Sequence, residues 1–134
     1  RVRRQSSALT DYDGRPARLP EFAKHLLGLL RHVLKQPGGH YFRYPVDPVK
    51  LGVPDYPSII THPMDLGTVM KRLEGNEYAS AEDVASDVRL TFNNAMVYNH
   101  VRTNPVHQAA RDLNDLFERR FRHLSQQLVR SAAG

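Results

Sequence analysis

The chain has 134 residues, an ordinary share of apolar and charged residues and a formal net charge of +5, which fits one folded domain and argues against disorder. It contains no cysteine, which excludes disulfides, thiolate zinc sites and cysteine nucleophiles. It has neither an apolar run long enough to cross a bilayer nor a signal-peptide pattern. Because it opens on Arg1 rather than Met, we expect it to be part of a longer protein.

The positive charge is concentrated at the two ends of the chain. Residues 1–18 carry five Arg against two Asp, residues 19–104 hold nine basic and nine acidic groups, and residues 105–134 hold five and three. We expect residues 1–18 to be a flexible basic lead-in, 19–130 to be the folded domain and 131–134 to be a C-terminal tail. The lead-in could make weak phosphate contacts with nucleic acid, but the neutral middle argues against a nucleic-acid-binding fold.

The first predicted helix begins near Pro20, which suits a first-turn position, and ends at Pro37-Gly38-Gly39. Its apolar residues recur at helical spacing: Phe22, Leu26, Leu29, Leu30 and Val33.

Residues 37–63 combine six prolines with many apolar and aromatic side chains. Loops of this length without regular structure are uncommon and are often functional. We expect this loop to pack against the body of the domain and to contain a short helical turn around Asp55–Ile60.

Three further helices are predicted. They cover Asp65–Glu74, then Ala81–Tyr98 with Ser80 as its cap, then a last helix that starts at Asn104-Pro105. The inner face of the last helix carries Val106, Ala109, Ala110, Leu113, Leu116, Phe117, Phe121, Leu124 and Leu128. No segment has the pattern of a strand. The sum predicts an all-α, antiparallel four-helix bundle with a long proline-rich loop between helices one and two.

An amide side chain stands where the third helix should carry a core residue. The apolar stripe of that helix runs through Val88, Phe92 and Ala95, and a further step of four reaches Asn99. A buried amide must form hydrogen bonds or cost about 1–3 kcal/mol. Either the fold or a ligand therefore satisfies Asn99. We interpret Asn94, on the same helix, as a structural amide.

In a bundle, the loop between helices one and two can meet the connection between helices three and four. Their meeting would form an apolar hole with one amide donor and one or two phenols. Such a hole selects a neutral group with a carbonyl at its tip and excludes a bare ammonium, because an unpaired buried charge costs several kcal/mol.

The sequence contains no recognisable catalytic or metal site. His62, His100 and His107 flank the loops, but no histidine pair has the spacing of a metalloprotease, and no carboxylate cluster accompanies them. Pro37-Gly38-Gly39 lacks the lysine of a phosphate-binding loop. We therefore predict a protein that is not an enzyme and that needs neither metal nor cofactor.

Several segments together resemble a bromodomain, the acetyl-lysine reader, from about Phe22 to Leu124. They are Phe42, Pro45-Val46-Asp47, Leu51, Pro54-Asp55-Tyr56, Ile59-Ile60, Pro63-Met64-Asp65-Leu66-Gly67-Thr68-Val69 and Tyr98-Asn99. The amino-acid sequence of Pro45–Val69 is most similar to the BET family and to related plant and protozoan factors. The resemblance implies a left-handed four-helix bundle that reads acetylated histone tails or other acetylated proteins. It also implies a nuclear protein of chromatin and transcription regulation, monomeric as an isolated domain.

The resemblance also implies a role for each site residue. Asn99 would donate to the acetyl carbonyl, and Tyr56 would hold a water that bridges to the same oxygen. The remaining lining would be Val46, Leu51 and Val53 as one wall, Phe42 as the floor, Tyr98 as the other side and Pro105, six residues after Asn99, as the gatekeeper.

Two departures from the BET pattern affect the rim. His40-Tyr41-Phe42 replaces Trp-Pro-Phe, so that the rim formed by His40 and Tyr41 is more polar, and Pro105 replaces Ile or Val. Two other functions stay open: a helical nucleic-acid-binding domain that uses its basic ends, and a hydrolase or transferase with an unrecognised site. A salt series separates the first of these from acetyl recognition, because phosphate-driven binding falls steeply as salt rises.

Overall fold

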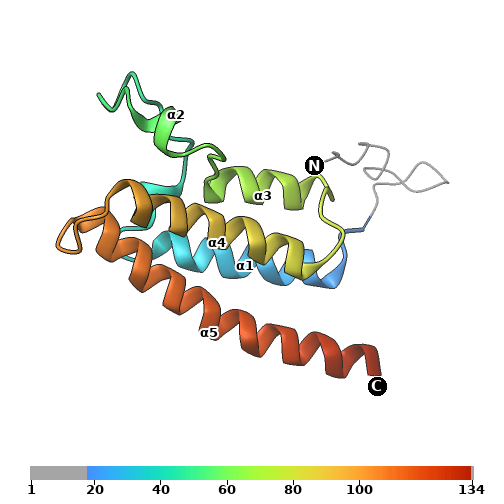
Figure 1. Cartoon of the computed structure of the whole chain (residues 1–134). Helices are drawn as coiled ribbons and strands as arrows, with labels where there is room; N and C mark the ends of the chain where they lie inside the picture. The colour runs from blue at the N-terminus through green and yellow to red at the C-terminus, as the bar shows by residue number, and fades with distance from the viewer. Residues whose placement is uncertain (1–17, 134) are drawn as a thin grey trace.

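The computed structural model describes residues 18–133, and this part of the chain is helical, without strands. Four helices form the body: α1 (Glu21–Lys35), α3 (Leu66–Glu74), α4 (Ala81–Tyr98) and α5 (Pro105–Ala133). A 3₁₀ helix, η2 (Gly39–Phe42), and a single turn, α2 (Tyr56–Ile59), lie in the long connection between α1 and α3 (Figure 1). The predicted all-α bundle, with its long loop after the first helix, is confirmed.

Polar side chains fix the starts of three helices. Asp65 precedes α3, and its carboxylate accepts a hydrogen bond from the backbone N–H of Thr68 at 2.9 Å. Ser80 and Asn104 cap α4 and α5 in the same way, at 3.2 and 2.8 Å, as the sequence predicts. The orphan N–H groups of these helix starts are thus partly satisfied within the fold.

The structure gives the helix bounds at both ends of the described chain. Pro20 precedes α1 as its N-cap residue and does not belong to its first turn. Helix α5 continues through Ala133, so residues 131–133 of the predicted C-terminal tail are helical, and the domain boundary at residue 130 stays a prediction. The predicted lead-in, except for Arg18, lies outside the described residues.

Helix α4 lies at the centre of the core. Its inner face is fully buried, and it packs against apolar faces of the other helices; the core includes Leu26, Leu30 and Val33 of α1, Leu66, Val69 and Leu73 of α3, Val84, Val88 and Phe92 of α4, and Leu113 and Phe117 of α5. A two-pronged ion pair joins α4 to α5 at the surface, since Arg89 donates to Glu118 from Nε at 2.7 Å and from Nη2 at 3.0 Å. No helix in residues 18–133 is long and apolar enough to cross a membrane.

The loop before α3 does not pack down as predicted. Tyr44, Val49 and Leu51 are 71%, 90% and 64% exposed, and Figure 1 shows the loop and α2 beyond the end of the bundle where α4 ends and α5 begins. The physical reason is local. Asp47 accepts hydrogen bonds from the backbone N–H groups of Val49 and Lys50, so this segment satisfies its polar groups within its own turn and leaves its apolar side chains outside.

Two ends of the loop are nevertheless fixed. Phe42 is buried and meets Phe92 of α4 edge to face, with 5.1 Å between ring centroids. At the other end, Tyr56 and Ile60 are buried. The predicted helical turn around Asp55–Ile60 is confirmed as α2. The loop is therefore held at both ends and open in its middle.

Candidate functional site

A small cavity of about 60 Å³ lies at the end of the bundle where the loop, the end of α4 and the start of α5 meet. Its lining comes from these elements and from α3's cap: Tyr41, Phe42, Tyr44, Val46, Tyr56, Met64, Asp65, Thr91, Ala95, Asn99 and Val106. The predicted convergence of the two connections at one end of the bundle is therefore present in the structure.

Asn99 is the C-cap residue of α4 and is half-buried. Its backbone N–H and its side-chain Nδ2 both donate to the carbonyl oxygen of Ala95, each at 3.0 Å. A side-chain amide nitrogen carries two N–H groups, so the bond to Ala95 fixes the amide and uses only one of them. The fold thus orients Asn99 at the cavity and leaves it with further hydrogen-bonding capacity.

Two phenols stand beside the cavity in different roles. Tyr56 is buried and lines it, and burial raises the pKa of this phenol. The rings of Tyr98 and Tyr56 pack at a tilt, with 5.0 Å between their centroids, and the hydroxyl of Tyr98 donates to Asp55 Oδ1 at 2.7 Å. That hydrogen bond raises the pKa of Tyr98. Both hydroxyls are therefore neutral donors at pH 7, and Tyr98 ties α4 to the loop rather than lining the cavity.

The predicted floor and rim are only partly in place. Phe42 and Val46 line the cavity, and Tyr41 stands at its edge with 40% of its surface exposed. His40 contacts Tyr41, at 4.2 Å between ring centroids, but lines a wider outer groove of about 810 Å³ instead.

Leu51 and Val53 do not line the cavity. Leu51 faces the outer groove, and Val53 is half-buried elsewhere in the loop. Their absence follows from the open middle of the loop, because the turn that begins at Asp47 holds this segment away from α4 and α5.

Pro105, the predicted gatekeeper, lies next to a lining residue but is not one itself. Pro105 is exposed and does not line the cavity, whereas Val106 does. Asn104 accepts from the N–H of Val106 and so makes Pro105 the first residue of α5, on its outer side. A signal for Val106 was available in the sequence, because it begins the inner-face pattern that continues through Ala110 and Leu113.

Other residues line the cavity that the sequence did not predict as site residues, among them Tyr44, Met64, Asp65, Thr91 and Ala95. The interpretation of Asn94 is confirmed, since its Nδ2 donates to the backbone carbonyl of His62 at 2.8 Å and anchors the loop. In residues 18–133, no group of three or more His, Cys, Asp or Glu side chains is arranged to hold a metal ion.

The Bromodomain family model matches residues 26–112, which is more than half of the chain. The chain is a bromodomain. The family assignment made from the loop motifs and Tyr98-Asn99 is therefore confirmed.

Relatives of this bromodomain occur in plants, fungi and amoebae. It is 47% identical over 107 residues to transcription factor GTE3, chloroplastic, of Arabidopsis thaliana, covering 80% of this chain and 23% of the relative. It is 36% identical over 105 residues to the SWR1 complex bromodomain subunit bdf1 of Schizosaccharomyces pombe, covering 78% and 18%. An ankyrin repeat, bromo and BTB domain-containing protein of Dictyostelium discoideum is 43% identical over 94 residues, covering 70% and 12%. The chain thus spans less than a quarter of the length of each of these relatives.

Proposed function

We propose that this bromodomain binds acetylated lysine in histone tails or in other acetylated proteins, as a reader that catalyses no reaction. The observation that carries the proposal is Asn99, whose amide is fixed by Ala95 at the rim of a small cavity lined by apolar and phenolic side chains. An acetylated lysine presents a neutral amide and a methyl group, which match one polar donor surrounded by apolar surface.

The size and charge of the cavity fit this ligand. A volume of about 60 Å³ holds a group of roughly the size of two water molecules, such as an acetyl cap, rather than a nucleobase. The carboxylate of Asp65 is buried and already accepts from the N–H and the hydroxyl of Thr68, at 2.9 and 2.6 Å. A bare ammonium would have to leave water for a site with no ready partner, and that desolvation costs several kcal/mol.

Each lining residue then has a role. The second N–H of Asn99 donates to the acetyl carbonyl, and the neutral hydroxyl of Tyr56 holds a water that bridges to the same oxygen. Phe42 forms the floor and Val46 one wall, while Val106 takes the gatekeeper position. Tyr98 positions Tyr56. Leu51 and Val53 would join the wall only when the middle of the loop folds over the bound acetyl-lysine, and His40 and Tyr41 form the rim.

The names of the relatives support a place in chromatin. One relative is named as a subunit of the SWR1 complex and another as a transcription factor, and we propose a nuclear role in transcription regulation for this protein as well. Weak nucleic-acid contact through residues 1–18 is compatible with such a role and is not required for acetyl recognition.

Calorimetry with one peptide in acetylated and unmodified forms tests the proposal. One small group fills the cavity and ordering the peptide opposes binding, so we expect dissociation constants of roughly 10–1,000 μM for the acetylated form and no measurable binding of the other. The preference should persist when residues 1–18 are removed and should change little with salt. Equal affinity for both forms, falling steeply as salt rises, would assign binding to a basic surface and reject the reader function.

A further inference from the structure

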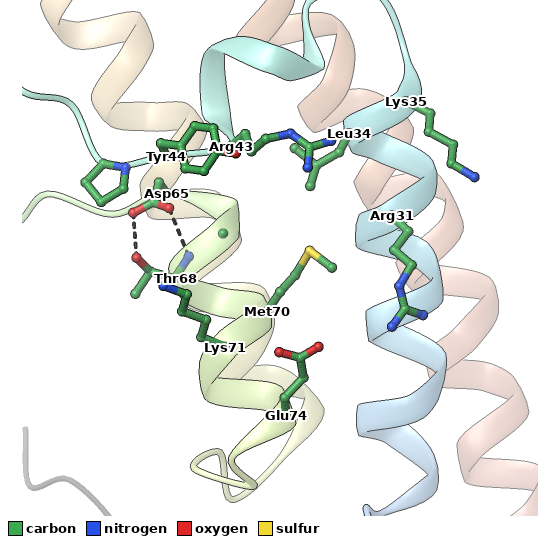
Figure 2. A pocket seen from close by; sticks show the side chains of 12 residues that line it. Arg31, Leu34, Lys35, Arg43, Tyr44, Asp65, Thr68, Met70, Lys71 and Glu74 are labelled. Carbon is green, nitrogen blue, oxygen red and sulfur yellow. Dashed lines mark hydrogen bonds between the residues drawn. The ribbon is translucent and has the colours of Figure 1, made fainter.

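A second depression, the α1–α3 cleft, lies between the end of α1, the start of the loop and α3. It measures about 460 Å³ and is lined by Arg31, Leu34, Lys35, Arg43, Tyr44, Pro45, Asp65, Gly67, Thr68, Met70, Lys71 and Glu74. Figure 2 shows Arg43 reaching across from the loop toward Leu34 of α1, with Met70 of α3 pointing into the space below. The cleft therefore combines a small apolar surface with several charged side chains.

Four cations surround this cleft: Arg31 and Lys35 from α1, Arg43 from the loop and Lys71 from α3. All four are exposed, and no acidic side chain in residues 18–133 forms an ion pair with any of them. The neutral overall charge of the folded middle thus conceals a local excess of positive charge, which the sequence spreads over three separate segments.

The two carboxylates of the cleft do not balance these cations. Asp65 is buried, and its oxygens accept the N–H and hydroxyl of Thr68 (Figure 2). Glu74 stands on the wall opposite Arg31, and no ion pair joins it to the cations. An anion that entered the cleft would therefore find guanidinium and ammonium groups without a partner, the groups that bind phosphate and carboxylate best.

The cleft adjoins the acetyl-lysine cavity, because Tyr44 and Asp65 line both. Arg43 immediately precedes Tyr44, and its backbone is held against α3: a Cβ added to Gly67 would collide with the carbonyl oxygen of Arg43. This close approach fixes the boundary between the two depressions. A peptide whose acetylated side chain fills the cavity can therefore place a neighbouring side chain over the cleft.

We propose that the α1–α3 cleft binds an anionic side chain that flanks the acetylated lysine in the same peptide. The inference rests on the proposed reader function and names its preferred substrate. A phosphorylated serine is the strongest candidate, since it brings up to two charges and three acceptor oxygens to Arg31 and Arg43, and an aspartate offers the same chemistry more weakly. Peptides with lysine or arginine at that position are disfavoured by like-charge repulsion.

The test is a calorimetric series on one acetylated peptide. Phosphoserine, aspartate, serine or lysine is placed in turn at each of about five positions on either side of the acetyl-lysine, which spans roughly 17 Å of extended chain. We expect one register at which phosphoserine binds about five- to fiftyfold more tightly than serine, aspartate gives a smaller gain and lysine binds most weakly. The gain should shrink as salt rises. No gain at any register would overturn the inference.

Two charge-matched variants locate the effect. Arg31→Gln with Arg43→Gln removes two cations from the cleft, and Arg119→Gln with Arg122→Gln removes two exposed cations from α5. The phosphoserine gain should fall to within about twofold in the first variant and persist in the second. Equal losses in both variants, or a gain that survives in the first, would refute the cleft as its cause.

Further binding measurements distinguish a failure of this inference from a failure of the reader function. If the acetylated serine peptide binds and Asn99→Ala removes that binding, but phosphoserine adds nothing, the cleft inference fails and the reader function stands. If the serine peptide binds no better than its unacetylated form, the reader function fails. A DNA duplex that loses affinity only in the Arg31→Gln, Arg43→Gln variant, together with no phosphoserine gain, would assign the cleft to nucleic acid and overturn the proposal.

Discussion

The Nδ1 atom of His107 lies 2.7 Å from the backbone carbonyl oxygen of Asn99. This hydrogen bond joins the first turn of α5 to the C-cap residue of α4, and it spans the connection beside the proposed acetyl-lysine cavity. The position of the Asn99 amide therefore depends on a side chain of the next helix as well as on Ala95 of its own.

We expect His107→Ala to lower the free energy of unfolding by about 1 kcal/mol, the net value of one hydrogen bond, and to weaken acetyl-peptide binding less than loss of Asn99 does. Denaturant unfolding and calorimetry measure both effects. His123→Ala, at an exposed position of α5, is the control and should change neither. Equal behaviour of the two variants would show that the contact with Asn99 has no energetic role.

Substitution of Gly67 tests whether the loop packs against α3, and the same substitution at Gly28 of α1 is the control. A methyl group at Gly67 would collide with the carbonyl of Arg43, whereas one at Gly28 would meet nothing within 4 Å. Gly67→Ala should therefore destabilise the domain by about 1–3 kcal/mol, and Gly28→Ala, inside α1, should stabilise it by about 0.5–1 kcal/mol. Chemical denaturation of both variants tests the pair, and a neutral Gly67→Ala would mean that the loop does not lie against α3.

The hydroxyl of Tyr78 donates to Asp87 Oδ2 at 2.6 Å, in a buried contact that also includes Arg72 at 3.3 Å. Burial, together with the hydrogen bond to Asp87, raises the pKa of Tyr78. In the unfolded chain the Tyr78 hydroxyl loses its proton near pH 10, while in the folded chain it keeps that proton. The unfolded state therefore binds fewer protons than the folded state above pH 10. The stabilising contribution of Tyr78 is therefore complete below pH 10 and declines as pH rises further.

Tyr78→Phe should reduce the alkaline loss of stability in a series of denaturant titrations from about pH 8 to 11. At neutral pH the same variant should be less stable than wild type by about 1–3 kcal/mol, because a partner of buried Asp87 is removed. The variant should still lose some stability as pH rises, because the pKa values of Tyr56 and Tyr98 are raised as well. Identical slopes for variant and wild type would contradict the role of Tyr78.

The gatekeeper position separates Val106 from Pro105. Val106 lines the cavity and Pro105 does not, so Val106→Ala should weaken acetyl-peptide binding by about two- to fivefold through lost apolar contact. Pro105→Ala should leave the affinity within about twofold of wild type. Calorimetry with one acetylated peptide distinguishes the two, and a larger loss for Pro105→Ala would restore the residue six positions after Asn99 as the gatekeeper.

The helices and Asn99 could be predicted because their signals are local. The apolar stripe of α4 leads by helical spacing to Asn99, and Ser80 and Asn104 mark helix starts by capping chemistry. Counting six residues from Asn99 led to Pro105 and missed Val106, which lines the cavity one position later, although Val106 begins the inner-face pattern of α5 in the sequence.

The conformation of the loop and the α1–α3 cleft could not be predicted, because they depend on contacts between segments distant in the sequence. The apolar composition of the loop does not show that Asp47 organises a separate turn that leaves Leu51 exposed. Nor does it show that Arg43 lies against Gly67, or that cations from α1, the loop and α3 gather around one cleft. Nothing in the local pattern of any one of these segments predicts their meeting.

Binding of one acetylated peptide by wild type and by Asn99→Ala tests the central claim most directly. The variant should keep its helical circular dichroism and lose about five- to hundredfold in affinity, because the acetyl carbonyl loses a hydrogen bond worth roughly 1–3 kcal/mol. Asn93→Ala, at an exposed position of the same helix, should bind like wild type. An Asn99→Ala domain that is folded and binds the acetylated peptide within twofold of wild type would contradict the assignment of this cavity as the acetyl-lysine site.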